Sequence, residues 1–229
     1  MSFVVAIDGP AGTGKGTITS LISKEMGLVN IDTGATYRCV ALYTIKNNIN
    51  LEEKEKIIES LPNIHIDMEN EEGTQKVYLN NEDVTSQIRS KEVSKIVSQI
   101  SSIKEVRFAM VEVQRNLAKG KDVIMEGRDI TTYVFPNANI KIYLDADEEE
   151  RAKRRYKEMQ EKGIEMTYEE VLNNIQIRDK NDKEKEIGAL KIAPDAIYID
   201  TTNLTIEEVK QKVEEIIKGK EEKIKWKKL

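Results

Sequence analysis

The sequence holds almost none of the residues from which disulfides and zinc sites are built. Among its 229 residues there is one cysteine, Cys39, and one histidine, His65. An internal disulfide is therefore excluded, and so is a zinc site made of cysteine and histidine ligands. A chain with so little cysteine is typical of a reducing compartment, and we expect a cytoplasmic protein.

Long hydrophobic runs and a strong excess of one charge are absent as well. The N-terminal apolar run, residues 3–7, is far too short to cross a bilayer and predicts a strand. Lysine and arginine number 36 against 41 aspartate and glutamate, so the net charge of −5 creates no overall basic field. We therefore expect neither a membrane nor a nucleic acid as partner. The basic tail at 219–229 is interpreted as a solvated helix end rather than as an RNA-binding segment.

Short apolar runs alternate with helix-forming segments along most of the chain. This alternation predicts an α/β protein with a doubly wound parallel sheet, in which helices cover both faces. The expected core strands are five, at 3–8, 28–32, 122–125, 140–145 and 196–200. We interpret 1–229 as one domain, and the segments that make up its core are 1–60, 103–147 and 189–218.

Two regions interrupt this alternation. Short alternating strands at 63–67, 76–79 and 83–85 predict a small antiparallel insertion at about 61–102, with Asn80-Asn81 as a turn. His65 falls on the polar side of the first of these strands, which favours a surface position over a catalytic role.

The second region, about 148–188, is helical and highly charged, and Thr167 to Glu170 resembles a capping box. Three arginines lie in its first helix, at 151, 154 and 155, and another lies at 178. Such a region is either a solvated surface or a mobile lid whose arginines close over phosphates.

The segment after the first strand fits the pattern G-x-x-x-x-G-K. Glycine-rich loops of this kind (P-loops) wrap backbone N–H groups around a nucleotide's phosphates, and the following helix directs its N-terminus at the same anion. We expect Lys15 to reach the outer phosphates of a nucleoside triphosphate. The pattern usually places serine or threonine directly after the lysine, but here Gly16 intervenes before Thr17. The residues expected to bind this nucleotide are Gly9, Pro10, Ala11, Gly12, Thr13, Gly14, Lys15, Gly16 and Thr17.

Acidic residues stand at or beside the ends of all the expected core strands. In parallel sheets ligands bind beyond the carboxyl ends of the strands, so these acids suit a magnesium–nucleotide site. Thr17 is the expected metal ligand, and Asp8 and Asp145 are weaker candidates that would hold magnesium-bound waters. The acids are Asp8, Asp32, Glu126, Asp145 and Asp200.

Together with the P-loop, four further segments give the chain a specific resemblance. They are Asp32-Thr33-Gly34-Ala35-Thr36-Tyr37-Arg38; Leu79 to Thr85 with Ile88-Arg89; Glu126-Gly127-Arg128-Asp129-Ile130 with 134–138; and Arg178-Asp179 with Asp182. The chain thereby resembles the bacterial cytidylate kinases, nucleoside monophosphate kinases, over about residues 3–210. The P-loop alone is common to many such kinases, which also carry Gly16-Thr17 in this form, whereas D-T-G-A-x-Y-R and G-R-D-I together are specific.

The resemblance implies ATP-dependent phosphorylation of CMP and dCMP with Mg²⁺. We expect the enzyme to be a monomer. It implies that 61–102 binds the monophosphate and that 148–188 is a lid. By motif position, Arg38 and Arg128 hold the acceptor phosphate. The cytosine contacts fall on Thr33, Arg107 and Asp129, and the sugar contacts fall on Ser98, Arg178 and Asp182. The expected catalytic residues are Lys15, Arg128, Arg151 and Arg155.

The chain departs from the family pattern at a few of these positions. Thr33 replaces a usual serine and keeps the hydroxyl, Glu126 stands where an aspartate is common, and Thr131 replaces a usual glycine. Lys185 stands where relatives carry an arginine that contacts the base, and a lysine cannot reproduce planar, bidentate recognition. We therefore expect Lys185 to bind substrate but to weaken the discrimination between bases.

Two alternative functions stay open from the sequence. A kinase for a different acceptor, such as adenylate, uridylate or shikimate, would share the P-loop but not the G-R-D-I segment. A non-catalytic nucleotide-binding regulator would keep the loop but would have no need of arginines for a second phosphate. A regulatory GTPase is disfavoured because the chain has no N-K-x-D segment.

Overall fold

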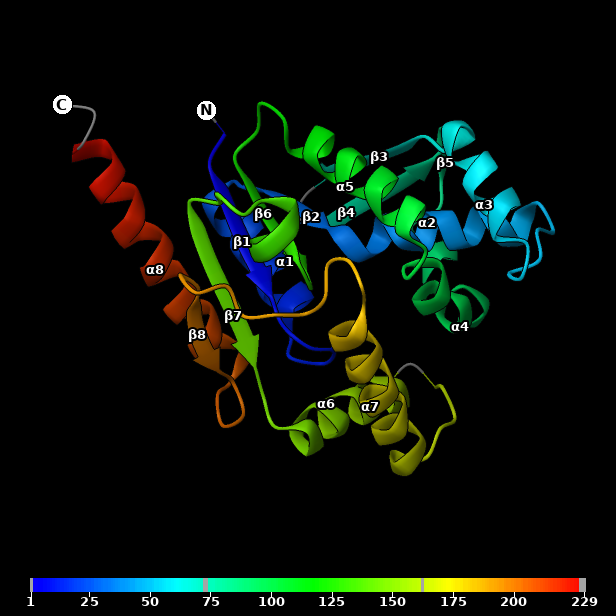
Figure 1. Cartoon of the computed structure of the whole chain (residues 1–229). Coiled ribbons are helices and arrows are strands. Elements are labelled where there is room, and N and C mark those ends of the chain that lie inside the picture. Colours follow the sequence, from blue (N-terminus) through cyan, green and yellow to red (C-terminus); the bar gives the residue numbers. More distant parts are fainter. Residues whose placement is uncertain (1, 72–73, 162, 227–229) are drawn as a thin grey trace.

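The structure is a computed structural model that describes residues 2–71, 74–161 and 163–226 (Figure 1). Its centre is a five-stranded sheet with the strand order β2-β6-β1-β7-β8. The strands are β1 (Val4–Asp8), β2 (Val29–Asp32), β6 (Val123–Gly127), β7 (Ile140–Asp145) and β8 (Ile197–Asp200). Every neighbouring pair is parallel. The predicted parallel sheet is thereby confirmed, and all carboxyl ends of its strands lie at one edge.

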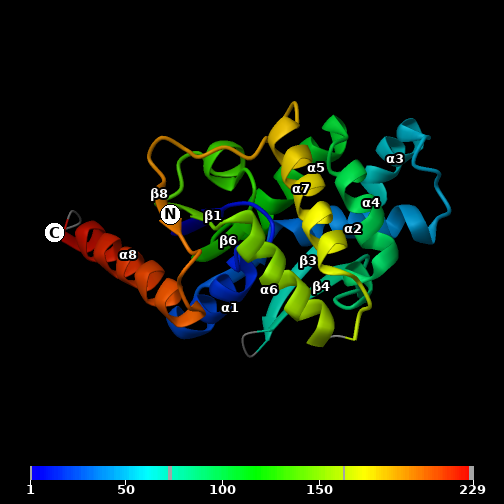
Figure 2. The same ribbon diagram turned by 90° about the horizontal axis from the view of Figure 1, so that it is seen from below.

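Alternating residues of the central strand point to opposite faces, and each face is covered by helices. Val5 and Ile7 pack with α1 (Lys15–Met26) and with α8 (Ile206–Trp226). Val4 and Ala6 belong to a second cluster, formed with α2 (Thr33–Lys46) and α5 (Lys104–Ala118). Seen from below, the helices lie on both sides of the strands (Figure 2). The fold is therefore doubly wound, as the alternation in the sequence predicts.

The antiparallel insertion is present as a separate three-stranded sheet. Its strands are β3 (Ile66–Glu71), β4 (Thr74–Leu79) and β5 (Glu82–Asp83). Asn80 and Asn81 join β4 to β5 with φ of 51° and 68°, a left-handed turn that asparagine tolerates. β3 begins later than the sequence suggests, and the exposed His65 precedes it.

Helices flank this small sheet in the chain. They are α3 (Lys54–Ser60) and α4 (Lys91–Ile100), with short 3₁₀ turns at Leu61–Asn63 and Gln87–Arg89. The α4 helix packs against α2 and so places the insertion beside the sheet core.

The charged region forms two helices, α6 (Glu148–Glu161) and α7 (Tyr168–Glu184). The predicted capping box is confirmed, because Thr167 and Glu170 exchange side-chain and backbone hydrogen bonds at the start of α7. A small core of Ala152, Val171 and Ile175 holds the two helices together. Figure 1 shows the pair beyond the end of the sheet toward which β7 points.

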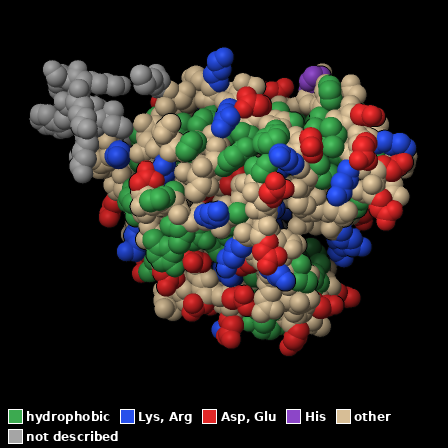
Figure 3. Space-filling view, in the orientation of Figure 1, with side chains coloured by type: hydrophobic (Ala, Val, Ile, Leu, Met, Phe, Trp, Pro, Cys, Tyr) green, Lys and Arg blue, Asp and Glu red, His purple; other side chains and the backbone are tan. Residues whose placement is uncertain are grey.

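The C-terminal helix α8 continues to Trp226, so most of the predicted basic tail is helical, and 227–229 lie outside the described residues. In both ribbon views its last turns extend away from the sheet (Figures 1 and 2). Over the face drawn in Figure 3, acidic and basic side chains are interspersed. No helix within the described residues combines the length and the apolar character that a membrane span requires.

Candidate active site

The P-loop joins β1 to α1 and passes close to other backbone segments. Gly9, Gly12 and Gly14 have φ of 154°, 83° and 86°, conformations that favour glycine. A Cβ atom at Gly9 would overlap the carbonyl oxygen of Leu144 on β7. The helix α1 begins at Lys15, with Gly14 as its N-cap. Thr17 is exposed in the first turn of this helix.

Lys15 is folded into its own loop. Its ammonium Nζ donates to the carbonyl oxygen of Pro10 at 2.6 Å and to Thr13 Oγ1 at 3.2 Å. Lys15 is 4% exposed. Burial is the largest cause that lowers the pKa of Lys15 well below its usual value, and the positive charge of Arg128 is the next. The loop therefore holds a desolvated cation at the centre of its backbone cradle.

Gly16 lies against Glu126 at the end of β6. A Cβ at Gly16 would stand 2.7 Å from Glu126 Oε1, so a residue with a side chain at this position would require the glutamate to move. Burial raises the pKa of Glu126 to about 7, and the neighbouring charge of Asp32 adds to the shift, while Lys15 and Arg128 oppose it. Glu126 was expected only as one of the acids at the strand ends, without a role of its own.

Asp8 and Asp145, the weaker magnesium candidates, are occupied by protein donors. Asp8 accepts from the backbone nitrogens of Ile130 and Thr131 at 3.0 and 2.7 Å, and from Thr131 Oγ1 at 2.6 Å. Asp145 accepts from the Ala146 nitrogen and from the Tyr198 hydroxyl. Both carboxylates therefore hold loops in place, and Thr131, a departure from the family pattern, supplies one of the donors.

Four arginines from different elements act on one another through their charges near the P-loop. Burial is the largest cause that lowers the pKa of Arg38 on α2, and the positive charges of neighbouring arginines lower it further. Burial among charged neighbours lowers the pKa of Arg178 on α7 to about 10, and Arg128 contributes next. Two of these arginines also have a carboxylate partner, Asp182 for Arg128 and Glu158 for Arg155. Arginines whose positive charges act on one another in this way favour the binding of an anion. The members of this arginine cluster are Arg38, Arg128, Arg155 and Arg178.

Arg107 and Asp129 form a buried ion pair beside this cluster. Arg107 Nη2 donates to Asp129 Oδ2, and Nη1 donates to the carbonyl oxygen of Ser101 at 3.3 Å. Arg107 is 3% exposed and lies over the ring of Tyr37, so it does not extend to solvent from the edge of its helix. Burial raises the pKa of Asp129 to about 6 against the opposing charge of Arg107.

A hollow of about 480 Å³ adjoins this pair and separates α4 and α5 from α7. Three of the expected substrate-binding residues line it: Ser98, Arg107 and Lys185. Asn181, which was not expected, contributes to the same wall, with Nδ2 at 3.5 Å from Ser98 Oγ. Thr33 instead donates to the carbonyl oxygen of Glu126 at 2.7 Å and lies at the start of α2.

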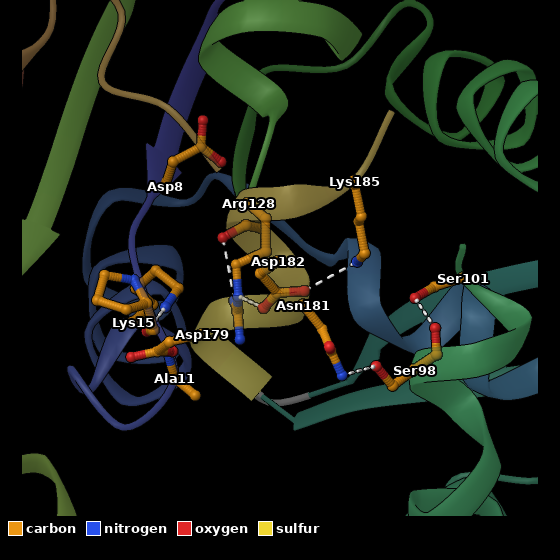
Figure 4. A network of polar contacts seen from close by, with 12 residues as sticks. Asp8, Ala11, Lys15, Ser98, Ser101, Arg128, Asp179, Asn181, Asp182 and Lys185 are labelled. Carbon is orange, nitrogen blue, oxygen red and sulfur yellow. Dashed lines mark hydrogen bonds and ion pairs between the residues drawn. The ribbon is translucent and has the colours of Figure 1, made fainter. Parts of the chain in front are cut away.

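Asp182 links the phosphate side of the site to this hollow. Its two carboxylate oxygens accept from Arg128 Nε at 2.9 Å and from Lys185 Nζ at 2.8 Å (Figure 4). Burial opposes ionisation, but Arg128 and Lys185 outweigh it and hold the pKa of Asp182 well below its usual value. The carboxylate therefore stays ionised and fixes two cations.

The three arginines of α6 have different environments. Arg151 is buried and contacts the P-loop at Ala11. Arg154 donates to the carbonyl oxygens of Thr201 and Thr202 after β8, at 2.6 and 3.2 Å. Arg155 is exposed and pairs with Glu158 at 2.6 Å. Of the two that were expected to be catalytic, Arg155 belongs to the arginine cluster, whereas Arg151 is bound to main-chain carbonyl oxygens and to Asp179.

Comparisons with known proteins show the family to which the sequence is related. Residues 5–219 match the family described as cytidylate kinase. The chain is 53% identical over 212 residues to the cytidylate kinase of Caldicellulosiruptor saccharolyticus, covering 93% of this chain and 94% of that protein. It is 50% identical to the cytidylate kinase of Fusobacterium nucleatum, covering 91% and 94%.

One solved structure, an uncharacterized protein from Eubacterium ventriosum, is similar in fold. Its TM-score is 0.51 at 11% identity, and the match covers 96% of this chain and 99% of that one.

Proposed function

The chain belongs to the cytidylate kinase family, and from that premise we propose that it transfers a phosphoryl group from ATP to CMP and dCMP, giving CDP and dCDP. One observation supports this activity above the others. Arg128 of the arginine cluster acts through its charge on Lys15 of the P-loop and is joined to Asp182. Asp182 in turn holds Lys185, which lines the hollow together with Arg107. One site therefore offers a donor cradle, charge for a second phosphate and a polar pair for a base. A nucleotide sensor has no use for the second and third of these.

The donor phosphates lie along the P-loop. The N-terminus of α1 and the backbone N–H groups of the loop face them, and Lys15 exchanges its bonds to Pro10 and Thr13 for phosphate oxygens. Because ATP brings negative charge to a desolvated ammonium, this exchange favours the charged form of Lys15. Arg155 and Arg178 on the lid helices add positive charge to the phosphoryl group in transit.

Magnesium fits the residues beside the P-loop. Thr17 offers a hydroxyl, and the neighbouring acids Glu126 and Asp32 are close enough for each other's charge to matter, which a cation would relieve. When bound, Mg²⁺ neutralises charge on the phosphates. Mg²⁺ usually keeps several waters and is bound by one or two carboxylates together with substrate phosphates.

The acceptor lies in the hollow between α4, α5 and α7. Arg38 and Arg128 hold its phosphate in line with the donor, and Asp182 keeps Arg128 in place. We assign the cytosine contacts to Arg107 and Asp129 with Thr33 and Lys185, and the sugar contacts to Ser98, Arg178 and Asp182. Of these residues, Ser98, Arg107 and Lys185 line the hollow. Phosphoryl transfer needs alignment and charge neutralisation more than covalent catalysis, and these groups supply both.

We assign residues 61–102 to monophosphate binding and 148–188 to a lid that closes over the phosphates and excludes water. The polar contact between Asn181 of α7 and Ser98 of α4 supports a lid that meets the insertion across the acceptor. We further propose a monomer that acts in the cytoplasm, where a free, buried thiol such as Cys39 is stable.

The test is a coupled assay with ATP, Mg²⁺ and each of CMP, dCMP, UMP, AMP and GMP. We expect CMP and dCMP to turn over much faster than AMP or GMP. Turnover of AMP that equals or exceeds that of CMP would contradict the assignment in favour of another nucleotide kinase. ATP binding without turnover of any acceptor would indicate a regulator.

A further inference from the structure

The P-loop is held from outside at one peptide unit, that of Ala11. The backbone nitrogen of Ala11 donates to Asp179 Oδ1 on α7 at 3.2 Å. The carbonyl oxygen of Ala11 accepts from Arg151 Nη1 on α6 at 2.9 Å. Arg151 Nη1 and Asp179 Oδ2 are themselves 2.5 Å apart, which closes a ring of three contacts. Figure 4 shows Asp179 directed from α7 toward Ala11 and Lys15.

This ring, which we call the Ala11 clasp, is buried and tightly packed. Arg151 and Asp179 are each 5% exposed. Gly12 follows Ala11 with φ of 83°, and a Cβ there would stand 3.1 Å from Arg151 Cβ and 3.2 Å from the Arg151 carbonyl oxygen. Arg151 Nε also donates to the carbonyl oxygen of Ala146, at the base of the lid, at 2.9 Å. The loop and both lid helices therefore meet at one point.

The clasp bears on ATP binding for two physical reasons. A loop with several glycines loses much conformational entropy when it orders around phosphates, and an external restraint reduces that loss. In addition, the Asp179 carboxylate of α7 contacts a loop that binds anions. Its negative charge would repel the phosphates unless a cation neutralised it. Arg151 is that cation, since it binds the same carboxylate and the same peptide unit.

We propose that Asp179 and Arg151 are positioning residues for the donor nucleotide: together they set the Ala11 peptide and couple the P-loop to the lid. Arg151 then acts through the loop rather than on the phosphoryl group. This inference rests on the proposed function in that the P-loop is taken as the ATP site.

The first test is the affinity for ATP and for CMP, measured separately by calorimetry on the full chain. Asp179→Ala should weaken ATP binding by roughly tenfold or more, the scale of a charged hydrogen bond, while CMP binding changes by less than about threefold. Asp179→Asn should lie in between, because its side-chain oxygen still accepts from Ala11 but no longer neutralises Arg151. Glu169→Gln removes an exposed carboxylate from the same helix and should leave both affinities unchanged.

The second test uses the sign of the coupling between the two residues. Arg151→Ala leaves the carboxylate without its cation beside the triphosphate, so it should weaken ATP binding more than Asp179→Ala does. The double variant should then bind ATP better than Arg151→Ala alone. Thermal unfolding of each variant shows whether the fold is intact. Asp179→Asn is the mildest change and serves as the reference if the other variants unfold.

Two results would overturn the clasp: ATP affinity of Asp179→Ala within twofold of the wild type, or ATP and CMP affinities that fall together. A double variant no better than Arg151→Ala would overturn the neutralising role of Arg151. These outcomes differ from a failure of the proposed function, in which the wild-type protein itself would not bind ATP or phosphorylate CMP.

Discussion

The P-loop is made of consecutive residues, whereas the proposed acceptor site collects side chains from α2, α4, α5, α7 and the end of β6. The donor cradle consists mainly of main chain, shaped by glycines and by the start of a helix, with Lys15 as its one charged side chain. The acceptor site consists of ion pairs, such as Arg107 with Asp129 and Asp182 with Arg128 and Lys185. A backbone cradle can accept any nucleoside triphosphate, so the choice of substrate rests on the side-chain half.

The largest expected effect tests the donor half. Lys15→Ala should lower kcat by about 10²-fold or more, because it deletes a charge that matters most in the transition state. The measurement is steady-state turnover with CMP and ATP, together with thermal unfolding to show that the fold is intact. Lys24→Ala, an exposed lysine on the same helix, is the control and should behave as wild type. A Lys15→Ala enzyme within a few-fold of wild type would show that the loop is not catalytic.

The next effect tests whether the two halves are separable. Arg38→Ala and Arg128→Ala should raise the KM for CMP by roughly 10- to 100-fold, since each removes a charged hydrogen bond to the acceptor phosphate. ATP binding should change little. CMP kinetics and ATP calorimetry on the two variants decide the matter. If ATP binding collapses while the KM for CMP is unchanged, the roles of the two halves have been exchanged.

A smaller effect concerns base choice within the acceptor half. Lys185 makes one ion pair with Asp182 and lines the hollow, where the planar fork of an arginine could fix a pyrimidine edge as well. Lys185→Arg should therefore raise the CMP/UMP ratio of kcat/KM by about 5- to 30-fold. Lys183→Arg, exposed on the same helix, serves as the control. An unchanged ratio would leave base choice to Thr33, Arg107 and Asp129.

The smallest effect is a pH dependence of the same half. The pKa of Asp129 is raised to about 6, so this carboxyl takes up a proton as the pH falls through 6 and its attraction to Arg107 weakens. Between pH 7.5 and 5.5 the ionised fraction falls about fourfold, and the KM for CMP should rise by a similar factor. Asp129→Asn should lack this component while keeping the titration of the CMP phosphate itself. Identical pH profiles for the two proteins would contradict the role of Asp129.

The contrast between the halves also explains what could be predicted from the sequence. The strands and the P-loop follow from local patterns, because apolar alternation and a glycine spacing are properties of neighbouring residues. The acceptor residues came from resemblance to a family, since nothing in a helix period indicates that Ser98 faces Asn181 across a hollow. Which side chains of distant helices lie together depends on tertiary packing, and local sequence patterns do not contain that information.

The arginines of α6 illustrate that limit. Arg151 and Arg155 are four residues apart, so the helix period places them on one face. Long, flexible side chains then separate them, because Arg151 reaches the Ala11 carbonyl and stays buried while Arg155 remains exposed beside Glu158. Glu126 shows the same limit: its place at the end of a strand can be predicted from the sequence, but its contact with Gly16 cannot.

The packing of Gly16 against Glu126 limits what position 16 can hold. A side chain there would require a carboxylate that sits among Lys15, Arg128 and Asp32 to move. The two residues are far apart in the chain, so the space available in the P-loop is set in part by a side chain on a different strand, β6.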